Sequence, residues 1–174
     1  MKKFKLLIGL LVSLAVLVGC GSVAFREPKM KEFARLILRE DLGGIRQVID
    51  SGFDINEMEG QLSFLYFSIS NNRFKSFKLL LEKGADIGRG EDGGTLYNIY
   101  ELAVLHDDTR YLEELLSAGM DPDVTLAYDS DRPLIYYSIT NRRKEAVDVL
   151  IAGGADLHFV DKVGLTPLSH AAGM

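Results

Sequence analysis

Histidine is the side chain that most readily moves protons near neutral pH, and this chain has three, at His106, His158 and His170. His106 precedes Asp107 and Asp108, and a neighbouring carboxylate could orient it as the general base of a hydrolase. Hydrolysis would also require a nucleophile or a metal, and the sequence contains no His-Glu-x-x-His, Gly-x-Ser-x-Gly, phosphate-binding glycine loop or paired-cysteine motif. We therefore favour a structural or solvated role for His106, and packing or hydrogen bonding for His170. The sequence predicts neither an enzyme nor a bound cofactor.

Four carboxylates in one predicted loop are the second group that could do chemistry. They belong to Asp121, Asp123, Asp129 and Asp131. Oxygen ligands suit a hard cation, but the segment lacks the ordered ligand spacing and the final bidentate Glu of a calcium loop. A solvated acidic loop is the favoured interpretation, and cation binding remains the alternative.

The chain has one cysteine, Cys20, which follows Leu17-Val18-Gly19. This segment resembles the bacterial lipobox, in which small residues precede a cysteine that receives diacylglycerol before cleavage on its amino side. The resemblance implies that Cys20 carries acyl chains such as palmitate. Several acyl chains on one residue hold a protein firmly at a membrane, whereas one chain binds reversibly.

The residues before Cys20 have the pattern of an export signal. Three lysines, at Lys2, Lys3 and Lys5, precede an apolar run from Leu6 to Val18. This run is shorter than the ~20 apolar residues that span a bilayer. We therefore predict a lipoprotein signal peptide over residues 1–19. An ordinary cleaved signal, or a single-pass anchor with a chance cysteine, is the alternative.

Residues 20–30 are predicted to be the lipidated cysteine and a tether. Gly21 to Pro28 lacks hydrophobic periodicity and, at ~3.3 Å per residue, reaches at most roughly 26 Å. Residue 21 is Gly, whereas in enteric-type bacteria an Asp after the lipidated cysteine is the usual signal for retention in the inner membrane. The expected location is therefore the cell envelope, on the outer membrane and facing the periplasm.

The charge balance limits the classes of partner. Removing residues 1–19 takes away three of the 20 Lys and Arg residues and none of the 25 Asp and Glu residues, so 17 − 25 gives a formal charge of −8. A chain with this charge is a poor electrostatic match for nucleic acid or for anionic lipid headgroups. We expect a protein partner, with membrane attachment through the lipid alone.

The sequence repeats itself. Segment 66–86 and segment 136–156 share residues at a constant offset of 70, among them Ser68, Ile69, Asn71, Arg73, Leu80, Gly84, Ala85 and Asp86 with Ser138, Ile139, Asn141, Arg143, Leu150, Gly154, Ala155 and Asp156. Segment 101–121 matches at half this offset, 35, and segment 34–56 matches at 32. Gly164 to Ala172 begins a further unit. A period of this size predicts a repeat architecture.

Each unit contains the pattern of two helices. In the second unit these are Phe64 to Ser70 and Phe74 to Lys83, and the latter carries Phe77, Leu80 and Leu81 at helical spacing. Gly84 follows the second helix, where a left-handed residue ends a helix at little cost. One unit cannot bury its apolar side alone, so neighbouring units must bury it.

The closing Gly-Ala-Asp and the Thr-Pro-Leu segment at Thr166 resemble the ankyrin-repeat family. The resemblance covers residues 31–174 and implies an all-α ankyrin-repeat solenoid of helix-turn-helix units with finger loops, with about four repeats and a C-terminal half repeat. The second and third units depart from the family pattern because they lack the opening Pro, and Arg132-Pro133 lies one residue out of register.

The resemblance implies that the first helices and the fingers bind a protein partner. The predicted contact residues are Phe67, Ser70, Asn71, Tyr97, Leu105, Asp123, Tyr128, Asp129, Asp131, Tyr137, Thr140 and Asn141. We expect Tyr66, Tyr100 and Tyr136 to fill core positions instead.

The predicted function is a membrane-tethered periplasmic interaction module. Its most specific form is an immunity or inhibitor lipoprotein that sterically blocks an envelope-targeting toxin, such as a secreted phospholipase, through a basic or catalytic face of that toxin. The alternatives are an envelope scaffold or chaperone for a periplasmic enzyme and, from another class, a hydrolase that uses His106.

Overall fold

The computed structural model describes residues 25–60, 62–88, 99–126 and 129–174, and this part of the chain is mostly helical. The helices are α2 (Pro28–Arg39), α3 (Leu42–Asp50), α4 (Phe64–Ser70), α5 (Phe74–Glu82), α6 (Ile99–Leu105), α7 (Arg110–Ser117), α8 (Leu134–Thr140), α9 (Lys144–Ala152) and α10 (Pro167–Ala172). None of these helices combines the length and the hydrophobicity needed to cross a membrane.

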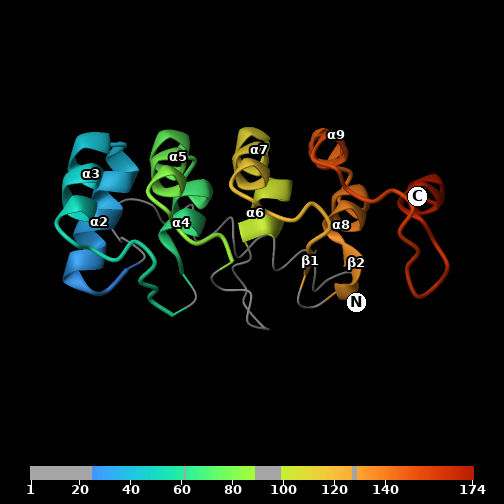
Figure 1. Ribbon diagram of the computed structural model, residues 1–174, viewed down its shortest axis with the longest axis horizontal. Coiled ribbons are helices and arrows are strands. Elements are labelled where there is room, and N and C mark those ends of the chain that lie inside the picture. Colours follow the sequence, from blue (N-terminus) through green and yellow to red (C-terminus); the bar gives the residue numbers. More distant parts are fainter. Residues whose placement is uncertain (1–24, 61, 89–98, 127–128) are drawn as a thin grey trace.

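The helices form pairs that stand side by side in a row (Figure 1). The first helices of successive pairs contact each other, α2 with α4, α4 with α6 and α6 with α8, and the second helices do the same from α3 to α9. α10 packs on α8 and ends the row without a second helix. The arrangement fits a helical repeat whose last unit is incomplete.

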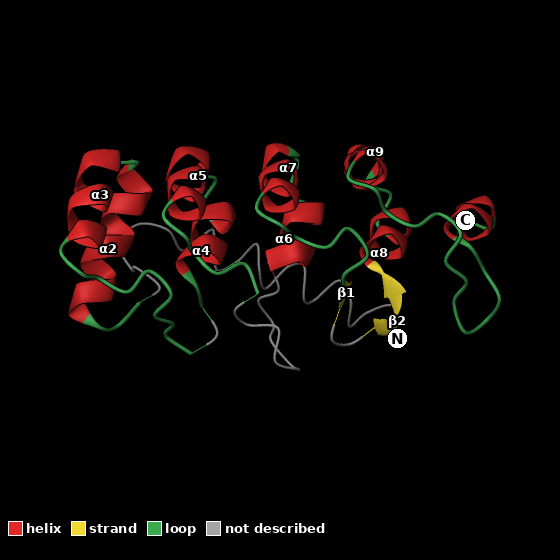
Figure 2. Ribbon diagram, viewed as in Figure 1, coloured by secondary structure: helices red, strands yellow, loops and turns green. Residues whose placement is uncertain are grey.

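A short pair of antiparallel strands is the exception to the helical pattern (Figure 2). β1 (Thr125–Leu126) pairs with β2 (Asp129–Pro133) in the loop between α7 and α8. The sequence predicted an all-α chain with a long finger here, so the strand pair is an addition to that prediction. Pro133 ends β2 and is followed directly by α8, because proline cannot continue the strand ladder but tolerates a helix start.

The turn after each second helix is built in the same way in four units. A glycine with positive φ ends the helix at Gly52, Gly84, Gly119 and Gly154. Two residues later, an aspartate accepts a hydrogen bond at 2.8–2.9 Å from the backbone N–H two positions further on, at Asp54, Asp86, Asp121 and Asp156. This side-chain turn explains why the closing Gly-x-Asp recurs in the sequence.

The turn between the two helices of a unit reaches forward to the next unit. Glu40 Oε1 accepts a hydrogen bond from the Lys75 backbone N–H at 2.9 Å. Asn72 Oδ1 accepts from the Tyr111 hydroxyl at 3.4 Å, and Asp107 is paired with Arg143 at 3.0 Å. Residues 40, 72 and 107 occupy equivalent positions of successive units, at the sequence offsets of 32 and 35. An acceptor at this position therefore ties three units to their successors.

One continuous apolar core runs along the row between the two layers of helices. The first helices contribute side chains such as Leu65, Ile69 and Val104, and the second helices contribute Phe77, Leu80 and Leu115, all at most 2% exposed. Burial of such side chains from water stabilises each unit only where a neighbour covers it.

The core begins earlier in the chain than the repeat pattern predicts. Phe25 is completely buried, with its ring centroid 4.6 Å from that of Phe64 and 5.3 Å from that of Phe67. Glu59 Oε2 accepts hydrogen bonds from the backbone N–H groups of residues 26 and 27, at 2.6 and 3.2 Å. Residues 25–30, which the sequence assigned to the tether, thus belong to the folded part, and the side chain of Phe25 packs on α4.

Replacing Phe25 by alanine tests whether this segment is docked on α4. We expect Phe25→Ala to lower the free energy of unfolding by about 3–5 kcal/mol, the usual cost of deleting a buried aromatic ring. Chemical denaturation of the full chain measures the change. Arg26→Ala is the matched control, because its side chain is exposed and its backbone N–H still reaches Glu59. A loss below about 1 kcal/mol for Phe25→Ala, in the range of surface substitutions, would show that the segment is not docked.

Candidate protein-binding surface

Polar side chains of three neighbouring first helices meet on one side of the row. The Tyr137 hydroxyl on α8 donates a short hydrogen bond to Glu101 Oε1 on α6. Thr140 Oγ1 on α8 lies 3.0 Å from His170 Nε2 on α10. We call the set Glu101, Tyr137, Thr140, Asn141 and His170 the first-helix face. All of its members are at least partly exposed, so the face is accessible to a partner.

The side chains of this face are held in place by their neighbours. Thr140 Oγ1 also donates to the Tyr136 carbonyl oxygen at 2.8 Å, and Asn141 Nδ2 donates to the Tyr137 carbonyl oxygen at 2.8 Å. The Tyr137 ring packs against the core while its hydroxyl lies at Glu101. A surface whose side chains are already fixed loses less conformational entropy when it binds.

Ser70 and Asn71 end α4 as Thr140 and Asn141 end α8. Asn71 Nδ2 donates to the Phe67 carbonyl oxygen at 2.8 Å, the same bond that Asn141 makes at the offset of 70. Ser70 Oγ donates to the same carbonyl oxygen at 3.0 Å. Both asparagines therefore satisfy helix carbonyl groups, and this local role is enough to explain their recurrence.

The prediction that Phe67 contacts a partner is not supported by the structure, because its side chain is buried. Phe67 is 5% exposed and packs edge-on against Phe25, so a partner cannot reach it. Tyr66, Tyr100 and Tyr136 are buried, as expected from the sequence. Leu105 is partly buried at the end of α6.

Several sequence predictions fall outside the residues that the structure describes. They are the signal peptide over residues 1–19, the lipidated Cys20 with residues 21–24 of the tether, and the contact residues Tyr97 and Tyr128.

The acidic side chains of the finger between α7 and α8 are engaged by other parts of the chain. Asp123 Oδ1 accepts the backbone N–H of Asp156 at 2.8 Å, which links two successive loops. Asp129 lies 4.0 Å from Arg132, and Asp131 forms an ion pair with Lys162. In the described part of the chain, no group of three His, Cys, Asp or Glu side chains could hold a metal ion. Asp123 and Asp131 thus connect loops, whereas the Asp129 contact lies within β2, and the cation-binding alternative gains no support from the described residues.

The last two fingers are joined by a buried ion pair. Asp161, whose side chain is 1% exposed, accepts Arg132 Nε at 2.9 Å. It also accepts the backbone N–H groups of Leu165 at 2.9 Å and Val163 at 3.0 Å. The hydrogen bond from Leu165, followed by that from Arg132, lowers the pKa of the Asp161 carboxyl below its ordinary value. Asp161 thus remains ionised and fixes the finger that precedes α10.

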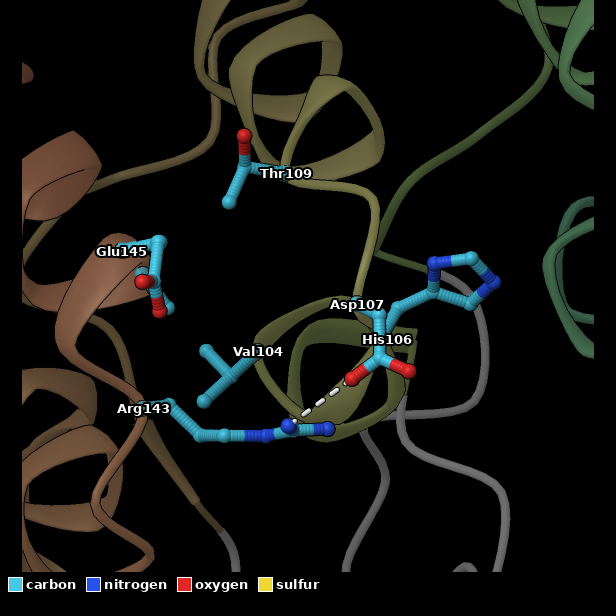
Figure 3. Close-up of a pocket in the computed structure, with 7 residues that line it drawn as sticks. Val104, His106, Asp107, Thr109, Arg143 and Glu145 are labelled. Carbon is cyan, nitrogen blue, oxygen red and sulfur yellow. Dashed lines mark hydrogen bonds and ion pairs between the residues drawn. The ribbon is translucent and has the colours of Figure 1, made fainter.

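His106 lies beside a small polar pocket but does not point into it (Figure 3). The pocket, of about 60 Å³, lies between α6 and α9 and contains the ion pair of Asp107 with Arg143. The His106 ring is turned away from that pair and packs edge-on against Tyr111 at 4.6 Å. Among the described residues, the imidazole contacts the Tyr111 ring and the backbone N–H of Asp108.

The hydrogen bonding of His106 supports a structural role. Its Nδ1 accepts the backbone N–H of Asp108 at 3.0 Å, which requires an unprotonated nitrogen. Burial lowers the pKa of His106, so the ring stays neutral. Burial also raises the pKa of the adjacent Tyr111 to about 12.

The structure brings together some of the predicted site residues and adds others. Tyr137, Thr140 and Asn141 lie on one continuous face, whereas Ser70 and Asn71 lie at the end of α4 and donate hydrogen bonds to a carbonyl oxygen of that helix. Sequence reasoning did not select His170 for this face, and it did not predict that Glu101 bonds to Tyr137. The signal available in the sequence was the spacing within each pair. Glu101 lies 36 residues before Tyr137, and His170 lies 30 residues after Thr140, both close to the repeat length.

Comparison with known proteins supports an ankyrin-like family. No family model matches the chain. It is 23% identical over 132 residues to an ankyrin repeat protein of fowlpox virus, and 29% identical over 140 residues to the protein PhlB of Serratia liquefaciens. It is also 33% identical over 75 residues to the BRCA1-associated RING domain protein 1 of Caenorhabditis elegans.

These matches cover 75%, 80% and 43% of this chain. They cover 30%, 60% and 10% of the respective relatives, so the chain spans less than two thirds of each relative's length. The sequence match to an ankyrin repeat protein is consistent with two features of this chain, the repeated Gly-x-Asp turns and the row of paired helices. The chain is therefore ankyrin-like in sequence, with a helical architecture that fits a repeat.

Proposed function

We propose that this chain is a protein-protein interaction module of the bacterial envelope that binds its partner through the first-helix face. The observation that carries the proposal is the pair of bonds from α8 to its neighbours, Tyr137 to Glu101 and Thr140 to His170. They place tyrosine, threonine and histidine side chains from adjacent units on one accessible and fixed surface. The ankyrin-like sequence supports a binding role for such a surface.

Tyr137 is the expected centre of the contact. Tyrosine combines a large apolar ring with a polar end and is enriched among the residues that dominate interface energies. Its ring already rests on the core, Thr140 and Asn141 follow it at the end of α8, and His170 on α10 contacts Thr140. A partner that covers this area would meet hydrogen-bonding groups around an aromatic centre, which is the usual composition of a protein interface.

Membrane attachment through Cys20 is the second part of the proposal. Residues 21–24 separate Cys20 from the docked Phe25 and, at ~3.3 Å per residue, reach at most roughly 13 Å. A lipid on Cys20 would therefore hold the folded part close to the bilayer, on the outer membrane and facing the periplasm. Tethering raises the local concentration of the module near any partner that acts on that membrane.

The most specific form of this function is an immunity or inhibitor lipoprotein. A tethered, acidic module without an evident catalytic arrangement is suited to cover the active site of a lipid-degrading toxin at the membrane. A scaffold or chaperone for a periplasmic enzyme would have the same build. The identity of the captured partner distinguishes the two, because a secreted lipase indicates immunity and a resident enzyme indicates a scaffold.

Two arginines introduced on the first-helix face test the binding surface. We expect Thr140→Arg combined with Asn141→Arg to reduce recovery of the partner at least tenfold, because both positions are exposed and the added side chains would obstruct the contact. The measurement is quantitative mass spectrometry of proteins cross-linked to the full-length chain in the envelope of its own cells.

Gln47→Arg combined with Ser117→Arg is the matched control. It adds the same charge at exposed positions of the second helices α3 and α7 and should leave recovery within about twofold of wild type. The proposal requires both double variants to retain the wild-type unfolding temperature within a few degrees. Equal recovery of the partner by the two double variants would remove the first-helix face as the binding site.

Replacing Cys20 by serine tests the anchor. We expect wild-type protein to sediment with membranes and to incorporate labelled palmitate, and Cys20→Ser to do neither, because a hydroxyl does not replace the thiol in the acyl transfer. Fractionation of cells and fluorography measure the two effects. Cys20→Ser protein that still incorporates label, or that stays in the membrane fraction after salt washing, would contradict lipid anchoring at this residue.

A further inference from the structure

Exposed apolar side chains gather at the C-terminal end of the row. In the described part of the chain, the large hydrophobic residues that are exposed are Ile151, Leu157, Val160, Val163, Leu168 and Met174. A groove of about 310 Å³ lies at the same end. Its lining combines Ile139, Val147, Ala171 and Met174 with three consecutive cations, Arg142, Arg143 and Lys144.

The groove lies where the row of second helices stops. α3 packs against α5, α5 against α7 and α7 against α9, whereas α10 packs on α8 and leaves the far side of α9 without a successor (Figure 1). A helix placed beside α9, as α9 lies beside α7, would cover the apolar lining of the groove. The repeat itself therefore defines the shape of the occupant, which is an amphipathic helix.

The positive charge of Arg142 favours an occupant with a negative charge. The equivalent residues of the three earlier units, Glu40, Asn72 and Asp107, are acceptors that bond to the start of the next second helix. Residue 142 follows residue 107 at the same offset of 35, but it is a donor. Its side chain makes no ion pair or hydrogen bond with the described residues, whereas Arg143 is paired with Asp107 and Lys144 lies 3.8 Å from Asp148.

We propose that the terminal groove binds an amphipathic helix of a partner protein, with a carboxylate at the start of that helix paired with Arg142. The apolar side of the helix covers Val147, Ala171 and Met174, and the basic rim selects an acidic helix over a neutral or basic one. This surface lies at the end of the row and shares no residue with the first-helix face, although Arg142 and Ala171 are the chain neighbours of Asn141 and His170. It therefore adds a second, adjoining point of contact to the proposed function.

One helix of the chain itself has the properties expected of the occupant. α7 follows Asp108, which lies one repeat before Arg143, and α7 carries Tyr111, Leu112 and Leu115 on its buried side. A copy of this segment placed one unit beyond α9 would bring its Asp108 to Arg142. The probe is therefore a fluorescein-labelled peptide with the sequence of residues 107–119, stapled on its exposed side so that helix formation does not limit binding.

Fluorescence anisotropy with the full chain in detergent micelles measures binding of this peptide. We expect saturable binding, weakened at least tenfold by Arg142→Glu in the protein and by Asp108→Arg in the peptide. Combining the two changes should restore at least half of the lost binding free energy, because the charges are then exchanged. Arg142→Glu should fold normally, since Glu40 adopts the same left-handed backbone, with φ of 51° against 57° for Arg142.

Arg46→Glu is the matched control, because Arg46 is an exposed arginine on α3 at the opposite end of the row. It should leave the dissociation constant within twofold of wild type. Absence of saturable binding to the wild-type chain, or equal binding by Arg142→Glu, would overturn the proposal. Sedimentation velocity adds a further outcome: a dimer of the chain alone that Met174→Glu abolishes would assign the groove to a second copy and also overturn the proposal.

Discussion

A two-helix unit of this chain has an apolar side that it cannot bury by itself. The described structure meets this constraint by placing each pair of helices against the next, so that one core runs between the layer of first helices and the layer of second helices. Polar side chains set the register of the stacking. Glu40, Asn72 and Asp107 each reach from the turn of one unit to the second helix of the next.

This constraint decides which surfaces remain for function. The sides that face neighbouring units are used for stability, and the fingers are tied to one another by pairs such as Arg132 with Asp161. Two accessible regions then differ in character. The first-helix face is polar and already ordered by hydrogen bonds, whereas the C-terminal groove is apolar with a basic rim. The first-helix face can bind a partner as a preformed contact area, whereas the C-terminal groove can bind a helix that completes the row.

The sequence predicted the positions of the helices and their terminating turns well, because these depend on local patterns. The offset of 70 and the closing Gly-x-Asp correspond directly to left-handed glycines and aspartate turns. The sequence predicted the candidate binding surface less well. Helical periodicity places Phe67 on a first helix, but it does not reveal that Phe25, from outside the repeat, covers it.

The roles of the acidic finger residues were missed for a related reason. A run of aspartates is typical of a solvated loop, yet Asp123, Asp131 and Asp161 each bond to a residue 29–33 positions away. Nothing in the local sequence links the two residues of such a pair, because only the stacking of successive units brings them together. The same applies to Glu101 with Tyr137, where residues from different units form one surface.

The most direct test of stacking by nearest neighbours is native-state hydrogen exchange of the full chain, followed by mass spectrometry at increasing denaturant concentration. Phe25 adds buried contacts to α4, whereas nothing in the described part of the chain covers the far side of α9 and α10. The account predicts that amides of α10 and then α9 exchange through openings of lower free energy than those of α4 to α7. A single opening free energy shared by all helices would contradict it.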